Sequence, residues 1–75
     1  MKRYYGLFLR HEGNLVGIAR EDDHSIIEKL NVKTDIWESF PNIEKYLKVN
    51  RIYKMMIEKE VAERAIRSLK QRKLH

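Results

Sequence analysis

The chain has 75 residues, no cysteine and a net charge of +5 at pH 7. This length indicates a single small domain, residues 1–75, and the absence of cysteine excludes disulfides and cysteine-bound zinc as sources of stability. The apolar runs are far shorter than the roughly 20 residues of a membrane-spanning helix, and neither the apolar core nor the cleavage site of a signal peptide follows Lys2 and Arg3. We therefore expect a cytoplasmic protein that makes no membrane contact.

Positive charge gathers at both ends of the chain, and negative charge gathers in the middle. Residues 1–20 carry four basic and one acidic side chain, residues 21–47 carry three and seven, and residues 48–75 carry nine and three. Basic ends indicate phosphate-bearing or acidic partners, whereas an acidic middle argues against nucleic acid lying across that part of the chain.

Residues 3–20 predict a β-hairpin. The runs RYYGLFLR and LVGIAR have the length and the aromatic and aliphatic content of strands, and the intervening HEGN supplies Gly13 and Asn14, which tolerate positive φ. Both strands carry apolar residues on both faces. We expect one face to pack against helices and the other to be exposed or covered by a second subunit.

The segment EKLNVKTDIWESF, residues 28–40, has the outline of a helix-turn-helix. Asp22, Asp23 or Ser25 is a candidate N-cap for a first helix that ends near Asn31, and Thr34 or Asp35 would cap a second short helix through Trp37.

In helix-turn-helix proteins the second helix reads DNA with exposed basic and amide side chains. The candidate here carries Asp35 and Glu38 and no basic residue, so a phosphate-lined groove would repel it. We expect its large apolar side chains to fill the core or an interface instead.

The remainder of the chain predicts a helix, a strand and a second helix. Pro41 suits the first turn of a short helix over PNIEKYLK. The alternation in RIYKMMIE favours a strand near 51–58, although a single helix from Glu44 to the end of the basic segment is the alternative. Residues 59–73 carry a clear apolar stripe and predict the C-terminal helix. The expected fold is α+β: an antiparallel three-stranded sheet, made of hairpin 3–20 and strand 51–58, packed with short helices and helix 59–73.

Three stretches together resemble a set of small phage-type proteins that have a DNA-binding-like core. The stretches are YYGLFLRHEGNLVGIA, IIEKLNVKTDIW and RIYKMMIE, and they span most of the first 58 residues. The resemblance implies a hairpin, a helix-turn-helix-like middle and a returning strand. It implies this topology more than any activity, and the C-terminal helix is extra.

Basic side chains near both ends form a candidate nucleic-acid surface, on which Tyr4, Tyr5 and Tyr53 would stack on single-stranded bases. The candidate residues are Arg3, Arg10, Arg51, Lys54, Arg64, Arg67, Lys70, Arg72 and Lys73. The alternative is a solvated helix face, because Glu60–Arg64 and Glu63–Arg67 have the spacing of stabilising helical ion pairs. For the tyrosines, the alternative is ordinary strand packing.

Catalysis finds little support in the sequence. His11, His24 and His75 lack the spacing of zinc ligands, and no glycine-rich phosphate loop is present. We therefore expect no enzyme activity, no metal and no cofactor.

Apolar side chains exceed what so small a core requires, and the candidate interface residues are Tyr5, Leu7, Trp37, Phe40 and Met56. Because Met55 and Met56 are adjacent, a strand points them to opposite faces, and at least one of them looks away from the helices. We expect a small, non-catalytic binding or regulatory protein that acts through protein contacts, as a homodimer or with another protein. The alternative is a nucleic-acid-binding protein that uses its basic N- and C-terminal segments.

Overall fold

The computed structural model describes residues 1–73, apart from the side chain of Lys73. The elements in chain order are β1 (Arg3–Leu9), β2 (Leu15–Glu21), β3 (Ile27–Asn31), β4 (Ile36–Ser39), α1 (Ile43–Val49), β5 (Ile52–Ile57) and α2 (Lys59–Lys73). The strands form one antiparallel sheet in the order β4-β3-β2-β1-β5. The last strand of the chain therefore pairs with the first, and β4 and β5 are the two edges.

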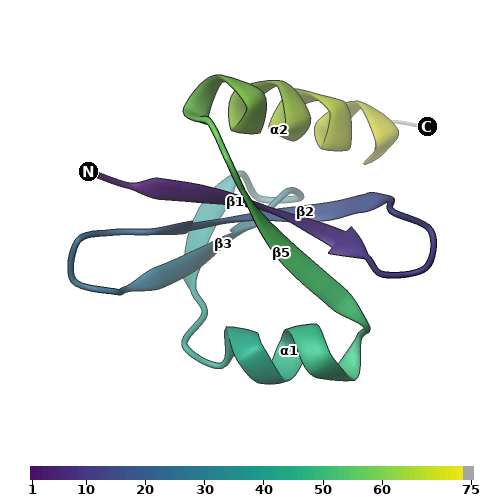
Figure 1. Ribbon diagram of the computed structural model, residues 1–75. Helices are drawn as coiled ribbons and strands as arrows, with labels where there is room; N and C mark the ends of the chain where they lie inside the picture. Colours follow the sequence, from purple (N-terminus) through teal and green to yellow (C-terminus); the bar gives the residue numbers. More distant parts are fainter. Residues whose placement is uncertain (74–75) are drawn as a thin grey trace.

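The two helices cover opposite faces of the sheet, as Figure 1 shows. On one face α1 buries Ile43 and Leu47 against Leu7, Ala19 and Ile52. The same alternation along the strands sends another set of apolar side chains to α2, and these are Ile18, Leu15, Val32, Trp37 and Ile57. Both faces of the hairpin are thus covered within the chain, which corrects the expectation that one face is left to solvent or a second subunit.

The sheet has five strands where the sequence predicted three, and the extra pair is residues 27–39. The helix-turn-helix outline is a β-hairpin, in which Leu30 of β3 lies opposite Trp37 of β4. Ile27 and Leu30 are spaced like one face of a helix. In the strand they point to opposite faces, and both are sheltered because each face of the sheet has its own helix.

Asp22, a candidate helix cap, and Asn31, the expected end of the first helix, instead close turns. Asp22 accepts hydrogen bonds from the N–H groups of His24 and Ile26, at 2.9 and 3.0 Å, and Asn31 accepts from the N–H of Lys33 at 3.0 Å. Asx side chains make these local bonds in turns as readily as at helix starts. Pairing with β2, where Glu21 lies opposite Ile27, decides the outcome.

The remaining predicted elements are confirmed. The first hairpin, the short helix after Pro41, the returning strand and helix 59–73 are all present. Residues 44–73 form helix, strand and helix rather than one helix. Asn50 ends α1 by donating its side-chain N–H to the carbonyl of Tyr46 at 2.9 Å, and Arg51 at a φ of 55° turns the chain into β5.

Candidate interaction surface

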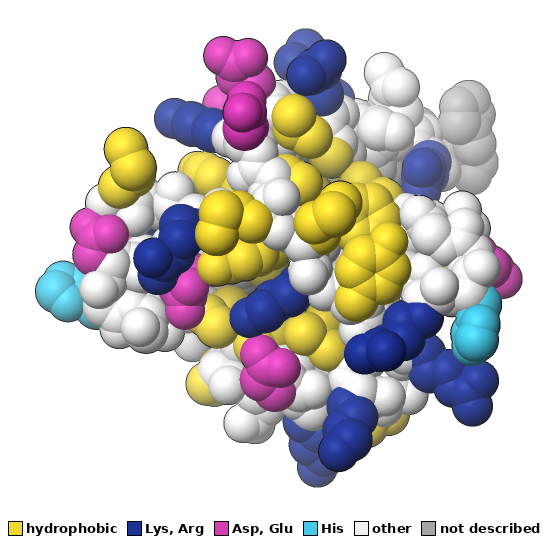
Figure 2. Space-filling view, in the orientation of Figure 1, with side chains coloured by type: hydrophobic (Ala, Val, Ile, Leu, Met, Phe, Trp, Pro, Cys, Tyr) yellow, Lys and Arg dark blue, Asp and Glu magenta, His cyan; other side chains and the backbone are white. Residues whose placement is uncertain are grey.

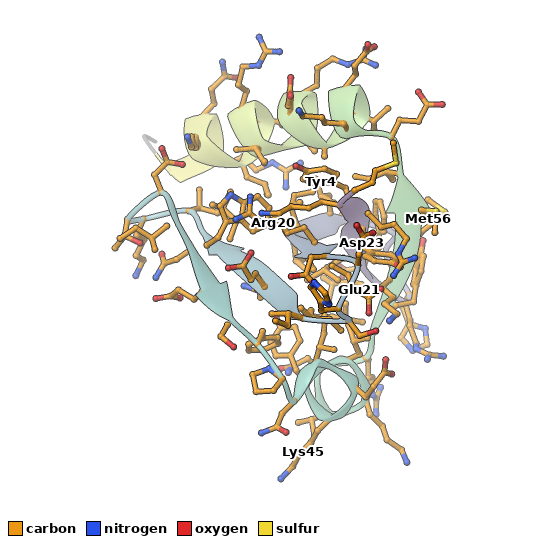
Figure 3. All side chains as sticks on the ribbon, turned by 90° about the vertical axis from the view of Figure 1, so that its left-hand side faces the viewer. Tyr4, Arg20, Glu21, Asp23, Lys45 and Met56 are labelled. Atoms are coloured by element: carbon orange, nitrogen blue, oxygen red, sulfur yellow. The ribbon has the colours of Figure 1, made fainter. Side chains whose placement is uncertain are left out.

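Edge strand β5 carries a group of exposed apolar side chains. The side chains of Tyr53, Met55 and Met56 are 37%, 49% and 62% exposed, and we call these three the β5 patch. Figure 2 shows hydrophobic side chains gathered over β5 and between β5 and α2. Figure 3 shows Met56 on the outer side of β5, pointing away from the sheet. An exposed apolar edge strand is a template for pairing with another chain.

The position of α2 explains why the patch is uncovered on one face. α2 packs mainly against β2 and β1, and it covers β5 at Ile57 while Tyr53 and Met55 stay exposed. Tyr53 rests on the ring of Phe8, with ring centroids 5.4 Å apart and planes inclined by 22°. Phe8 in turn folds over Gly6, where a Cβ atom would lie 2.6 Å from its ring. Gly6 thus lets an aromatic pair lie flat beside Met55, its cross-strand neighbour.

The outer edge of β5 also presents backbone groups. The carbonyl of Arg51 accepts a hydrogen bond from the N–H of Arg10 at 2.9 Å, so the backbone groups of this residue face β1. In an antiparallel ladder these groups alternate between the two sides of a strand. The N–H and C=O groups of Lys54 and Met56 therefore face the outer edge, where a further strand could bond to them.

Lys54 is the single charged residue within β5, and its charge is held toward α1. Its Nζ lies 3.3 Å from Oε1 of Glu44 and 5.1 Å from the ring centroid of Tyr5. Charged side chains on edge strands normally discourage pairing. Lys54 is turned toward α1 and is the single charged side chain of the strand, so the β5 edge carries little charge that would oppose pairing with another strand.

The opposite edge differs in length and charge. β4 has four residues against six in β5, and it includes Glu38. Asp35, just before it, is ion-paired with Lys70 of α2 at 2.8 Å. Ile36 is 57% exposed but stands alone, since Trp37 lies under the guanidinium of Arg20 at 4.1 Å. β5 is therefore the better candidate for an interaction surface.

A hollow of about 750 Å³ opens where β5 ends and α2 begins. Its lining is mostly apolar and includes three basic side chains and one acidic side chain; it consists of Met1, Lys2, Arg3, Tyr4, Met56, Ile57, Glu58 and Lys59. The hollow extends the β5 patch toward the start of α2.

The structure separates the five interface residues named from the sequence. Leu7 is fully buried in the core and does not reach the surface. Tyr5, Trp37 and Phe40 are half-buried and have partners within the chain: Tyr5 donates to Glu21, and the other two pack in the two cores. Met56 is well exposed. Tyr53 and Met55 were not among the interface candidates, although the adjacency of the two methionines had marked the strand.

The candidate nucleic-acid residues fall into three places. Arg3 is ion-paired with Glu21 at 3.0 Å, and this hydrogen bond raises the pKa of its guanidinium. Arg10, Arg51 and Lys54 lie near one another at the start of β5, where Arg10, Lys48 and Lys54 line a second hollow of about 500 Å³.

The other basic candidates belong to α2 on the opposite face of the sheet. Arg64 and Arg67 are exposed, and the expected pairs with Glu60 and Glu63 are not among the ion pairs of the described residues. Lys70 pairs with Asp35, and Arg72 donates to the carbonyl of Leu15 at 3.1 Å. The side chain of Lys73 lies outside the described residues.

The histidines and acids do not assemble a metal site in residues 1–73, where no three His, Asp or Glu side chains gather closely enough to hold an ion. His11 and His24 are exposed in turns, and His75 lies outside the described residues. In the same part of the chain, neither helix has the length and apolar character needed to cross a membrane.

Comparisons of the chain with protein-family models, with curated proteins and with solved structures found no match. The resemblance to small phage-type proteins therefore stays a prediction, and residues 26–37, which would supply its helix-turn-helix-like middle, lie in a β-hairpin and its turns.

Proposed function

We propose that the protein is a non-catalytic interaction module of the cytoplasm that associates with a second copy of itself through β5. The observation that carries this proposal is an uncovered edge strand whose exposed side chains are apolar apart from a single lysine, Lys54. Methionine and aromatic side chains are enriched at protein interfaces.

Pairing two β5 strands would do two things at once. It would give hydrogen-bond partners to the backbone groups of Lys54 and Met56, and it would remove the β5 patch from water. Burial of apolar surface contributes about 25 cal/mol per Å², and main-chain bonds across an added strand supply affinity with little demand on sequence.

Sedimentation of the purified protein over a wide concentration range tests the proposal. We expect a concentration-dependent dimer, and we expect Met56→Lys to weaken it by at least tenfold, because a second charge at an edge strand opposes pairing. Ile36→Lys is the matched control, since Ile36 has nearly the same exposure on the opposite edge strand. A protein that stays monomeric, or a dimer that responds to Ile36→Lys and not to Met56→Lys, would refute the proposal.

The second candidate function is binding of single-stranded nucleic acid, and one observation favours it. Arg10, Lys48 and Lys54 come together around the hollow at the start of β5, with Arg51 adjacent and one acid, Glu44, among them. Such a cluster would hold phosphates, and the exposed ring of Tyr53 on the same strand would stack on a base.

Fluorescence anisotropy with a labelled single-stranded oligonucleotide at low and near-physiological salt tests this second function. Binding should weaken steeply with salt, because each phosphate contact releases counterions. Arg10→Gln should weaken it severalfold, whereas Arg67→Gln on α2 should not. Absence of binding even at low salt would exclude this function.

A further inference from the structure

We propose that the dimer is symmetric about an axis through Met56, so that Lys54 of each copy pairs with Glu58 of the other. This inference rests on the proposed self-association through β5. Two identical antiparallel strands related by a two-fold axis perpendicular to the sheet place one residue opposite its own copy. The exposed part of β5 is residues 53–56, and an axis at Tyr53 would set the two α1 contacts directly opposite each other, so that residue is Lys54, Met55 or Met56.

An axis at Lys54 is unfavourable because of charge repulsion and because of steric crowding. It would set the two lysines directly opposite each other, and like charges in that position are destabilising. It would also crowd the two α1 helices, which lie on the same face of the extended sheet. α1 meets β5 around Ile52 and Lys54.

The position of the axis sets the distance between the two helices. Each residue adds about 3.4 Å along a strand. Taking residue 53 as the centre of the contact with α1, an axis at Lys54 offsets the helices along the strands by about 7 Å, and an axis at Met56 offsets them by about 20 Å. Helices with side chains are about 10–12 Å wide, so the axis at Met56 leaves the most room.

An axis at Met55 leaves the charges unmatched. Lys54 would face Met56 of the second copy, and Glu58 would face Ile52, which is buried beneath α1. Apolar pairs would still form between Tyr53 and Ile57. This register is sterically open, but it uses neither charge at the edge.

An axis at Met56 matches each side chain with a suitable partner. Lys54 meets Glu58 of the second copy, Met55 meets Ile57, and the two Met56 side chains meet on the axis. The pair of Lys54 with Glu58 and the pair of Met55 with Ile57 each occur twice, and the Met56 pair occurs once. Glu58 is exposed and is not part of an ion pair among the described residues, so it is available.

The layout of α2 suits this arrangement. α2 packs mainly over β2 and β1, and on its side of β5 it covers Ile57 but leaves Tyr53 and Met55 exposed. The hollow beside Tyr4, Ile57 and Lys59 lies at the end of β5, where the first part of the second copy's β5 would arrive. The second copy would therefore lie over the hollow.

Disulfide cross-linking of single-cysteine variants determines which residue lies on the two-fold axis, because the chain has no cysteine of its own. The variants are Lys54→Cys, Met55→Cys and Met56→Cys, oxidised at concentrations where the parent protein is dimeric and examined by non-reducing electrophoresis. Opposed residues in a hydrogen-bonded pair have Cα atoms about 5.5 Å apart, within the range a disulfide spans.

We expect Met56→Cys to form covalent dimers rapidly and the other two variants to form few. With the axis at Met56, the two Met55 positions are diagonal neighbours, more than about 7 Å apart, which is too far to bridge without backbone movement. Preferential cross-linking through residue 55 or 54 would overturn this register. A parent dimer in which none of the three cross-links would overturn it as well, while a parent that remains monomeric would refute the self-association itself.

A charge exchange tests the pairing independently. Lys54→Glu and Glu58→Lys should each weaken the homodimer by about tenfold or more, because two attractions become two repulsions. An equimolar mixture of the two variants should form a heterodimer of near-parental affinity, since both cross-pairs are then restored. Glu44→Gln, which removes only the partner of Lys54 within the chain, is the control and should change affinity by less than about twofold. A mixture no tighter than its components would contradict the pairing.

Discussion

Arg20 is predicted to stabilise the sheet more than a similar arginine elsewhere in it, because it lies across three strands. It belongs to β2, and its Nε donates to Glu28 of β3 at 2.8 Å while its guanidinium lies 4.1 Å from the ring centroid of Trp37 in β4. Tyr4 of β1 meets the same indole edge-to-face, with centroids 6.3 Å apart. Figure 3 shows Arg20 and Tyr4 on the side of the sheet that faces α2.

The size of the effect follows from these contacts. The Arg20 and Glu28 side chains are 19% and 29% exposed, so solvent screens their ion pair in part, and it contributes about 0.5–1 kcal/mol. A cation over an indole at a half-buried site adds about 1 kcal/mol. Arg20→Met keeps an unbranched apolar stem but removes the guanidinium, and it should lower the free energy of unfolding by about 1.5–2 kcal/mol.

Arg3→Met is the matched control. Arg3 also makes a cross-strand pair, with Glu21 at 3.0 Å, but its side chain is 48% exposed and has no indole beneath it among the described contacts. Its loss should be distinctly smaller than that of Arg20→Met, because solvent screens an exposed ion pair. For a domain of this size, each loss of about 1 kcal/mol corresponds to about 4–8 °C in Tm.

Urea denaturation followed by circular dichroism measures both losses, and the emission of Trp37, the only tryptophan, supplies a second readout. Arg20→Met should shift that emission to longer wavelength, and Arg3→Met should leave it unchanged. Equal losses for the two variants, with no change in emission, would refute the assignment of extra stability to the contact between Arg20 and Trp37.

Three further predictions concern the core, the support of the β5 patch and a turn. Ile43→Ala should lower the free energy of unfolding, measured in urea, by about 2–4 kcal/mol, because Ile43 is nearly fully buried between α1 and the sheet. The control is Val49→Ala at an exposed position of α1, which should cost under about 0.5 kcal/mol. Similar losses for the two variants would contradict this core. Gly6→Ala should cost about 1 kcal/mol and alter the aromatic circular dichroism, because the new methyl group displaces the ring of Phe8; an unchanged spectrum would count against the close approach. The N–H groups of Ile26 and His24 hold the pKa of Asp22 below its ordinary value of 3.8, so its contribution is full above that value and is lost as pH falls through the lower pKa of the folded state. Asp22→Asn should flatten this part of the Tm-versus-pH profile, and a profile with the same acid dependence would exclude the role of Asp22.

Elements of the fold could be predicted where the local sequence pattern fits only one type of secondary structure. Helix 59–73 has an apolar stripe along one face, and Val49-Asn50 ahead of β5 breaks the preceding helix. The sequence of residues 25–40 was compatible with two structures, a pair of short helices and a β-hairpin. Asp22 and Asp35 serve equally at helix starts and in turns, and the spacing of Ile27 and Leu30 fits a helix or a strand covered on both faces. Pairing with β2 selects the strand, and that contact is distant in sequence.

The candidate surface was harder to predict, because exposure of β5 depends on the strand order. The adjacency of Met55 and Met56 predicted that at least one of them would look away from the helices, and the structure exposes both. Met55 is exposed because α2 packs mainly over β2 and β1 and covers β5 only at Ile57, and Met56 is exposed because α1 contacts the start of β5. Had β5 paired on both sides, the same two methionines would have been core residues. The candidate surface is therefore set by which strand ends the sheet, and the sequence of β5 alone, IYKMMI, does not contain that information.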